Sequence, residues 1–183
     1  GELADRFGLD RVEVIEVEVA GPPTSVTLRA AGWAEAVVLI AGIGAPSDVV
    51  SVEPATGISP ERVVVRTTDG AVAAASVTAA GIVVHVQAGA ALDEVTLRSY
   101  CIGAAHMAFG WVTSEGIAVD ADGTVLDLTI RSLGVLKASD TPHIQIVVDP
   151  SGGEPVQVSD AVFAAVAAAT WRHLGCPTDW PTG

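Results

Sequence analysis

Glu154 is the residue whose setting best suits acid–base chemistry, because it lies in the short flexible stretch Gly152-Gly-Glu-Pro155. A carboxylate in such a loop can act as a general base when burial brings its pKa toward the working pH. Most glutamates are solvated, however, so the residue types alone favour an exposed loop carboxylate. Glu154 is therefore a candidate that needs support from elsewhere in the chain.

The histidines form no recognisable metal or catalytic motif. His85, His106, His143 and His173 are well separated, and no pair has the i,i+4 spacing that places two ligands on one helix face. We predict no metal site, and we expect His85 and His106 to be interior or boundary residues with hydrogen-bond partners. A Ser–His–Asp arrangement assembled in space stays open, although no GxSxG sequence marks a nucleophile.

A glycine-rich stretch at residues 42–47, GIGAPS, begins like a dinucleotide-binding fingerprint. The third glycine is missing, Pro46 interrupts the pattern, and no helix clearly follows it. We therefore interpret this stretch as the end of a strand that turns into a loop.

Composition indicates one folded domain over residues 1–183 and excludes some partners. Half of the 183 residues are hydrophobic and only 17% are charged, which argues against disorder. The net charge of −13 repels phosphate, so we expect neither nucleic acid nor an anionic membrane surface as a partner. Cys101 and Cys176 form no CxxC pair, and a reduced, cytoplasmic location is the expectation.

The first half of the chain is predicted to be rich in strands. Val12–Val19 alternates apolar residues with glutamate, as a strand with one solvated face does. Apolar Ala34–Ile43, bounded by glycines, suits a buried strand. The uncharged stretch 71–92 is long enough to span a bilayer, but its valines and glycines favour a soluble hairpin. Further strands are expected at Ser25–Arg29, Val49–Val52, Arg62–Arg66, Val72–Thr78 and Ile82–Gln87.

Two helices follow, and they make the fold class α+β with a mixed or antiparallel sheet. The first, about 93–115, has Asp93 as its N-cap and should stop at Gly116. The second, about 160–174, is rich in alanine and preceded by Ser159 as its expected cap. Between the helices we expect strands at Ile117–Val119, Thr124–Arg131 and His143–Val148.

The helix at 93–115 is apolar on nearly every side, which predicts a central, buried helix. Gly103 and the alanines near it would let another backbone or a flat ligand approach closely.

Residues 98–172 resemble the C-terminal part of the molybdopterin-binding subunits of the xanthine dehydrogenase/aldehyde oxidase family. That family has a glycine-rich helix ending in glutamate, then a strand, an xDxPxIxV segment, a GxGE motif and an AVxxAxxxA helix. This chain has GAAHMAFGWVTSEG at 103–116, SDTPHIQI at 139–146, GGEP at 152–155 and AVFAAVAAA at 161–169. The resemblance covers roughly the last 40% of the chain, and the first 90 residues suggest the same β-rich region only loosely.

The resemblance implies hydroxylation of aldehydes or N-heterocycles at a molybdenum held by a pterin dithiolene. The glutamate of the GxGE motif is the family's catalytic base, and only Glu154 matches it here. Gly103 and Gly110 match small, cofactor-facing positions of the family's helix. Molybdopterin is thus the cofactor implied by resemblance, and this chain alone is not expected to enclose it.

Two departures from the family pattern concern the same helix. The family carries glutamines where this sequence has Tyr100 and Met107, and neither side chain offers an amide's paired donor and acceptor. The segment before the glutamate is also shortened to Pro150-Ser-Gly-Gly153, and no cysteine pattern for iron–sulfur clusters is present.

Three interpretations stay open from the sequence. The chain is a component of a molybdopterin-dependent oxidoreductase that acts only with partner subunits, or a diverged non-catalytic domain of the same fold that serves protein interaction, including as a homo-oligomer. The third interpretation is a small-molecule-binding module with a pocket beside the central helix. Whether the chain belongs to an enzyme is therefore undecided at this point.

Overall fold

The structure, a computed structural model, describes residues 26–44, 47–57, 59–126, 129–179 and 181. The described residues contain a five-stranded sheet with the strand order β1-β2-β3-β4-β5. The expected strand at Val12–Val19 lies outside the described residues. Helix α2 is the first element within them.

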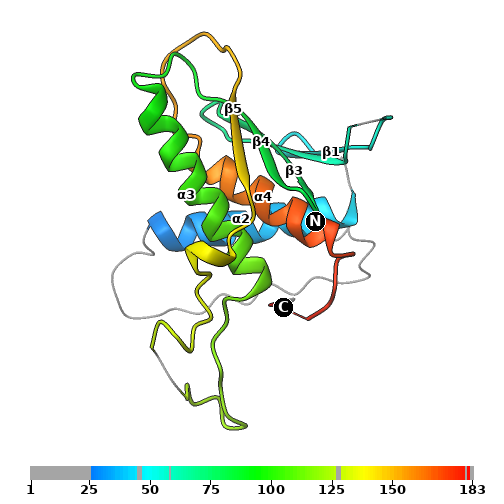
Figure 1. Ribbon diagram of the computed structural model, residues 1–183, viewed down its shortest axis with the longest axis vertical. Coiled ribbons are helices and arrows are strands. Elements are labelled where there is room, and N and C mark those ends of the chain that lie inside the picture. The colour runs from blue at the N-terminus through cyan, green and yellow to red at the C-terminus, as the bar shows by residue number, and fades with distance from the viewer. Residues whose placement is uncertain (1–25, 45–46, 58, 127–128, 180, 182–183) are drawn as a thin grey trace, which may run out of the picture.

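The sheet is mixed, as the sequence predicted. Strands β1 to β4 pair with their neighbours in antiparallel fashion, and β5 joins β4 in parallel (Figure 1). The hairpin β3–β4 confirms the interpretation of residues 71–92, and no helix in the described residues is long and apolar enough to cross a membrane. The strands are β1 Val50–Glu53, β2 Arg62–Arg66, β3 Val72–Thr78, β4 Gly81–Gln87 and β5 Ile144–Val148.

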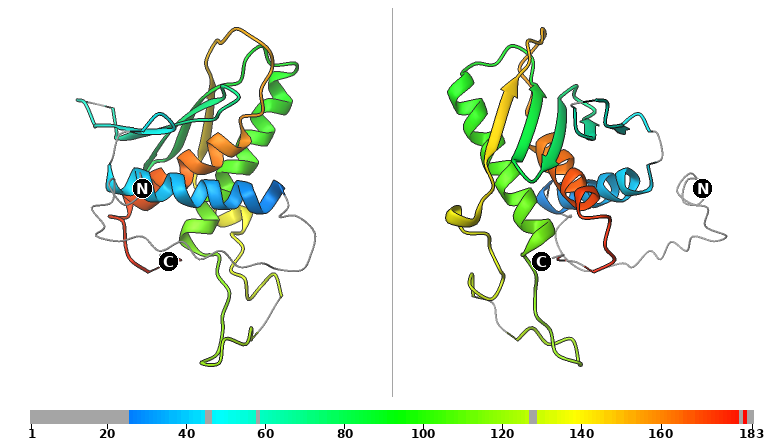
Figure 2. Two further views of the ribbon diagram at one scale, coloured as in Figure 1. Left: turned by 180° about the vertical axis from the view of Figure 1, so that it is seen from behind. Right: turned by 45° about the vertical axis from the view of Figure 1, so that its right-hand side comes forward.

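Three helices cover one face of the sheet, as the two views in Figure 2 show together. Helix α4, Ser159–His173, packs on β2 and β3. Helix α2, Val26–Ile43, lies against α4, and helix α3, Glu94–Thr113, packs on α4 and β5. The fold class and the positions of the two predicted helices are thus confirmed. The prediction that the helix at 93–115 is the central, buried one is wrong: α4 has that place, whereas α3 exposes Tyr100 and Met107 on one face.

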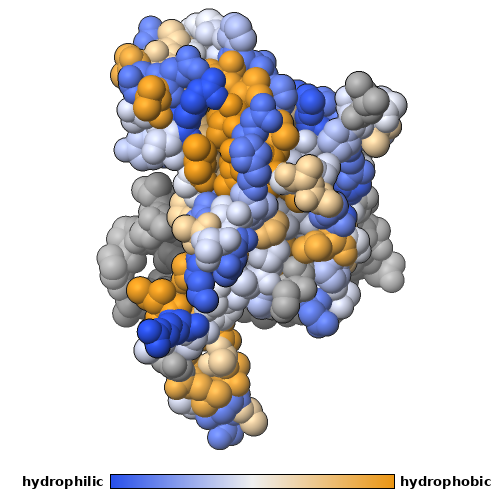
Figure 3. Space-filling model, viewed as in Figure 1, coloured by the Kyte–Doolittle hydropathy of each residue, from blue (hydrophilic) through white to orange (hydrophobic). Residues whose placement is uncertain are grey.

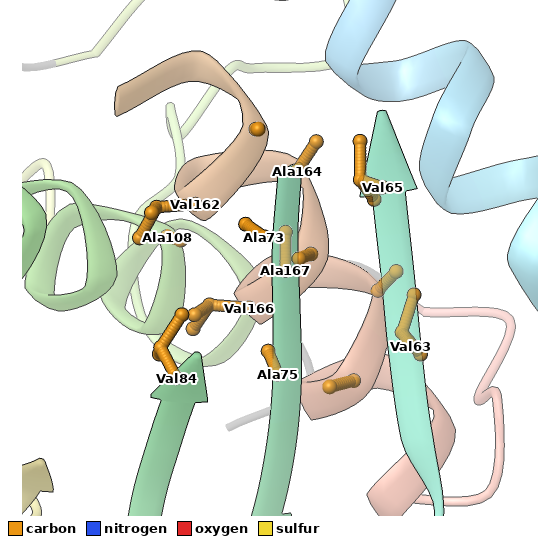
Figure 4. Packing of buried hydrophobic residues seen from close by; sticks show 14 of the residues in the cluster. Val63, Val65, Ala73, Ala75, Val84, Ala108, Val162, Ala164, Val166 and Ala167 are labelled. Atoms are coloured by element: carbon orange, nitrogen blue, oxygen red, sulfur yellow. The ribbon is translucent and has the colours of Figure 1, made fainter. Parts of the chain in front are cut away.

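Small side chains fill the layer between α4 and the sheet (Figure 4). Alanines of β3 face alanines and valines of α4, so the helix backbone can approach the strands closely. Because the packing is close, each lost methyl group leaves an unfilled space that costs stability. Ala73, Ala75, Ala164, Val166 and Ala167 are all fully buried there.

Helix α2 corrects the prediction of strands at Ser25–Arg29 and Ala34–Ile43, since residues 26–43 form one continuous helix. The apolar run suggests a buried strand because nearly every residue in it is hydrophobic. Only one face of the run is buried, however, and the buried positions follow the i, i+3, i+4, i+7 spacing of a helix. They are Ala34, Val37, Val38 and Ala41.

The strands expected at Ile117–Val119 and Thr124–Arg131 are also wrong. These residues belong to an excursion that extends away from the body of the molecule (Figures 1 and 2), closed at its base by a Gly116 N–H to Leu133 C=O hydrogen bond of 3.0 Å. Only an isolated bridge joins Val119 and Val125 in its described residues. The apolar pattern has no neighbouring strand to pair with, and hydrophobic surface gathers at the excursion's lower end (Figure 3).

The capping residues predicted the start of α3 correctly, but not the end of α3 or the cap of α4. The Asp93 carboxylate accepts a 2.6 Å hydrogen bond from the Thr96 N–H, which confirms it as the N-cap of α3. The helix ends at Thr113, two residues before the expected Glu115. Ser159 is the first residue of α4 rather than its cap, which is Val158 without a side-chain hydrogen bond.

Candidate functional site

Helix α3 presents one face to two adjoining grooves. Tyr100, Ala104, Met107 and Trp111 follow the i, i+4, i+7, i+11 spacing of a single helix face. The first groove, of about 460 Å³, lies between the N-terminal half of α3 and the segment 155–159. The second, of about 390 Å³, lies among α2, α3 and α4. Ser159 lines both, so we refer to them together as the α3 groove.

The first part of the α3 groove has apolar walls with a polar end. Leu92 and Tyr100 are 92% and 66% exposed and lie in the same lining, so they add to one exposed apolar surface. Asp93 and Thr96 form the polar end at the start of α3. The remaining walls come from Ala88, Ala91, Leu97, Pro155, Val156, Gln157 and Val158.

The second part of the α3 groove is aromatic with an acidic rim. The rings of Trp111 and Phe163 lie 5.4 Å apart and tilted, as aromatic pairs prefer. Met107 belongs to the same lining as these two rings, and its side chain is 54% exposed to solvent. Glu35 and Asp160 supply the two carboxylates of this part.

Glu154 lies at the end of the first part of the groove, and its side chain is exposed. Its loop runs alongside the residues after β4, with the Ala90 N–H bonded to the Gly153 C=O at 3.1 Å. The main chain is close there: a Cβ on Gly89 would lie 2.0 Å from the Glu154 carbonyl oxygen. The backbone of this loop is thus fixed, while the described part of the chain leaves the carboxylate exposed.

The two glycines matched to the family's helix do not line the α3 groove. Gly103 has open space where a Cβ would stand, whereas a Cβ on Gly110 would meet Leu136 at 3.1 Å and the Glu115 carboxylate at 2.7 Å. Gly110 is therefore closed off by the chain's own residues. It also lies about 24 Å along α3 from the end beside Glu154, at 1.5 Å per residue. The structure does not bring Glu154 and Gly110 together.

A polar cluster at the C-terminal end of α3 has no signal in the sequence. His106 Nδ1 lies 2.9 Å from the Thr141 hydroxyl, and that hydroxyl donates to the Lys137 C=O at 3.1 Å. Because the single hydroxyl hydrogen goes to Lys137, Nδ1 of His106 carries a hydrogen and donates to Thr141. Burial raises the pKa of Glu115, and the nearby His106 opposes that shift.

The expectation that His85 and His106 are boundary residues with partners is confirmed. His85 Nδ1 lies 3.3 Å from the Asp149 carboxylate, which follows the neighbouring strand of the sheet. The partners of both histidines are distant in sequence, so no local spacing could have revealed them.

The groove residues do not fit an anionic pterin cofactor. No lysine or arginine lines the α3 groove in the described residues, and Gln157 is the single amide there. Tyr100 and Met107 replace the amides expected from the resemblance, and three carboxylates would repel a phosphate. No cluster of three His, Cys, Asp or Glu side chains in the described parts of the chain could hold a metal ion.

No family model and no curated protein matches the chain. Several solved structures superpose on part of it. Quinoline 2-oxidoreductase from Pseudomonas putida 86 gives a TM-score of 0.45 at 17% identity, over 64% of this chain and 17% of that one. The Cu,Mo-CO dehydrogenase in its carbon monoxide reduced state gives 0.46 at 13%, over 63% and 16%.

Reconstituted CO dehydrogenase from Oligotropha carboxidovorans gives a TM-score of 0.45 at 13% identity, over 62% of this chain and 15% of its own. The chain therefore spans less than a fifth of the length of each of these proteins. The likeness of this chain to quinoline 2-oxidoreductase and to the CO dehydrogenases is therefore confined to part of each protein.

Proposed function

We propose that this chain is a component of a molybdopterin-dependent oxidoreductase that hydroxylates an aldehyde or an N-heterocycle, and that it acts only with other chains. One observation carries the proposal. The segments of the sequence resemblance, which are α3, the stretch leading into β5, the Glu154 loop and α4, form one packed unit. A shared fold requires these segments to follow one another in this order and to pack on one another, and the observed arrangement meets that requirement.

The need for other chains follows from the α3 groove and from Glu154. The groove offers an anionic cofactor neither cations nor a set of amides, so the cofactor must be held largely by partners. Glu154 is the proposed catalytic carboxylate, and its exposed position requires a partner surface to enclose it. Gly103 remains open to an approaching group, whereas the space beside Gly110 is occupied by Leu136.

The proposal is tested on the complex purified from the native host. Molybdenum analysis and pterin fluorescence should show both components in a complex that contains this chain. Finding neither of them, in the native complex or after co-expression with partner chains, would remove the oxidoreductase assignment.

Glu154→Gln should abolish turnover by that complex while leaving its assembly and its molybdenum content unchanged. Glu53→Gln, which changes another exposed glutamate at the end of β1, is the matched control and should keep full activity. Unchanged turnover in Glu154→Gln would contradict the role of this carboxylate.

The second candidate is a diverged, non-catalytic domain of the same fold that serves protein interaction or small-molecule binding. Tyr100 and Met107 favour it, because they place an exposed phenol ring and thioether where the resemblance implies amides. A stable native complex without molybdenum and pterin would favour this candidate over the first.

A further inference from the structure

The α3 groove has the length of a docked helix. It extends from Asp93 to Trp111 along one face of α3, which corresponds to about 27 Å at 1.5 Å per residue. A partner helix of about 18 residues would cover it completely. Both walls are well defined, since α3 forms one of them and the 155–163 segment with residues 31–35 of α2 forms the other.

The α3 wall of the groove, with Leu92 just before it, offers anchoring surface for an apolar helix face. Leu92, Tyr100 and Met107 are at least half exposed, and small alanine side chains belong to the same lining. An amphipathic helix binds such a surface through apolar side chains at i, i+3, i+4 and i+7. Large exposed apolar side chains along one groove are typical of an interaction surface.

The charge around the groove determines which kind of helix fits. Asp93, Glu35 and Asp160 lie in its lining, and no lysine or arginine lines it in the described residues. A helix with basic flanks would meet complementary charge along this rim. A second copy would bring another acidic surface and the same net charge of −13, which opposes self-association through this face.

We propose that the α3 groove docks an amphipathic, basic α-helix of a partner chain. This inference goes beyond the oxidoreductase proposal, because it depends only on the shape, the apolar lining and the acidic rim of the groove. Loss of the cofactor assignment would leave it intact.

A synthetic 18-residue peptide of leucine and lysine, with leucines at helical i, i+3, i+4 and i+7 positions and a fluorescent label, is the probe. Its binding to the full chain is measured by fluorescence anisotropy. A scrambled peptide of the same composition tests whether charge alone causes binding. The ordered peptide should bind at least tenfold more tightly than the scrambled one.

Met107→Glu separates docking in the groove from general attraction between acidic protein and basic peptide. The substitution makes the protein more negative, so general attraction predicts equal or tighter binding. Docking predicts at least a tenfold loss, because the new carboxylate would be covered by leucine side chains. Leu174→Glu adds the same charge at an exposed position outside the groove and should leave the affinity unchanged.

Circular dichroism checks that each variant is folded. Leu92→Gln is a second groove variant, and because its side chain is 92% exposed, the substitution should weaken peptide binding without disturbing the fold. Equal binding of both peptides, or undiminished binding to Met107→Glu, would overturn the inference. Sedimentation of the chain alone gives one further check. A dimer that Met107→Glu dissociates would assign the groove to a second copy instead.

Discussion

At the scale of single residues, glycines that look alike in the sequence have different surroundings in the structure. Gly103 and Gly110 lie seven residues apart on α3, yet only Gly110 is in close contact with another part of the chain. Gly89 received no role from the sequence, although its backbone contact with Glu154 fixes the loop of the candidate carboxylate. Close approach between distant segments has no local sequence signal, and for that reason the sequence pointed to Glu154 as a candidate but not to its neighbour Gly89.

Two alanine substitutions should therefore have opposite effects on stability. Gly103→Ala should raise the free energy of unfolding by about 0.5–1 kcal/mol, since alanine is the better helix former and its Cβ meets nothing. Gly89→Ala should lower it by about 2 kcal/mol or more, because φ is +68° and the new Cβ would meet the Glu154 carbonyl. Urea denaturation measures both, and a stabilising Gly89→Ala would contradict the close approach of these two loops.

At the scale of secondary-structure elements, the sequence was most informative where a pattern has a local cause. The strands β2 and β3 were predicted with their observed ends, and Asp93 was identified as the cap of α3. Helix α2 could not be recognised because a nearly continuous apolar run hides its helical spacing. The excursion after α3 could not be recognised because alternation shows strand preference but not whether a neighbouring strand exists.

Asp93 also gives α3 a pH-dependent contribution to stability. Hydrogen bonds from Thr96 lower the pKa of Asp93 from its ordinary 3.8, so its contribution is present above that value and lost as the pH falls through the lowered pKa. Asp93→Ala should therefore lower the melting temperature at pH 7 but have little effect at the most acidic pH values. Asp93→Asn keeps an N-cap without the charge and should show a weaker pH dependence; identical curves for both variants would argue against the cap.

At the scale of the whole molecule, one arginine joins three separate parts of the fold. Arg172, near the end of α4, makes two hydrogen bonds of 2.6 and 2.9 Å to the carboxylate of Glu61, just before β2. It also donates to the Ala41 carbonyl at 2.7 Å, in the last turn of α2. The bidentate geometry lowers the pKa of Glu61 and orders the ends of both helices.

Arg172→Met should lower the free energy of unfolding by about 1–3 kcal/mol, because hydrogen bonds to charged groups are lost and the Ala41 carbonyl loses its donor. Glu61→Gln removes only the charge of the partly exposed ion pair and should cost under about 1 kcal/mol. Denaturation at pH 7 tests the order of the two effects. A larger loss for Glu61→Gln would show that the ion pair, and not the helix contact, matters more.

The parallel pairing of β5 with β4 has a consequence for the way the chain acquires its fold. Strands β1 to β4 pair with sequence neighbours, so these hairpins can form from local contacts. Strand β5 can add to β4 only after the chain has passed through α3 and the excursion, which makes its contacts the most distant in sequence within the sheet. The Glu154 loop, which comes after β5 and contacts Gly89, depends on the same distant contacts, so we expect the candidate site to form late in folding.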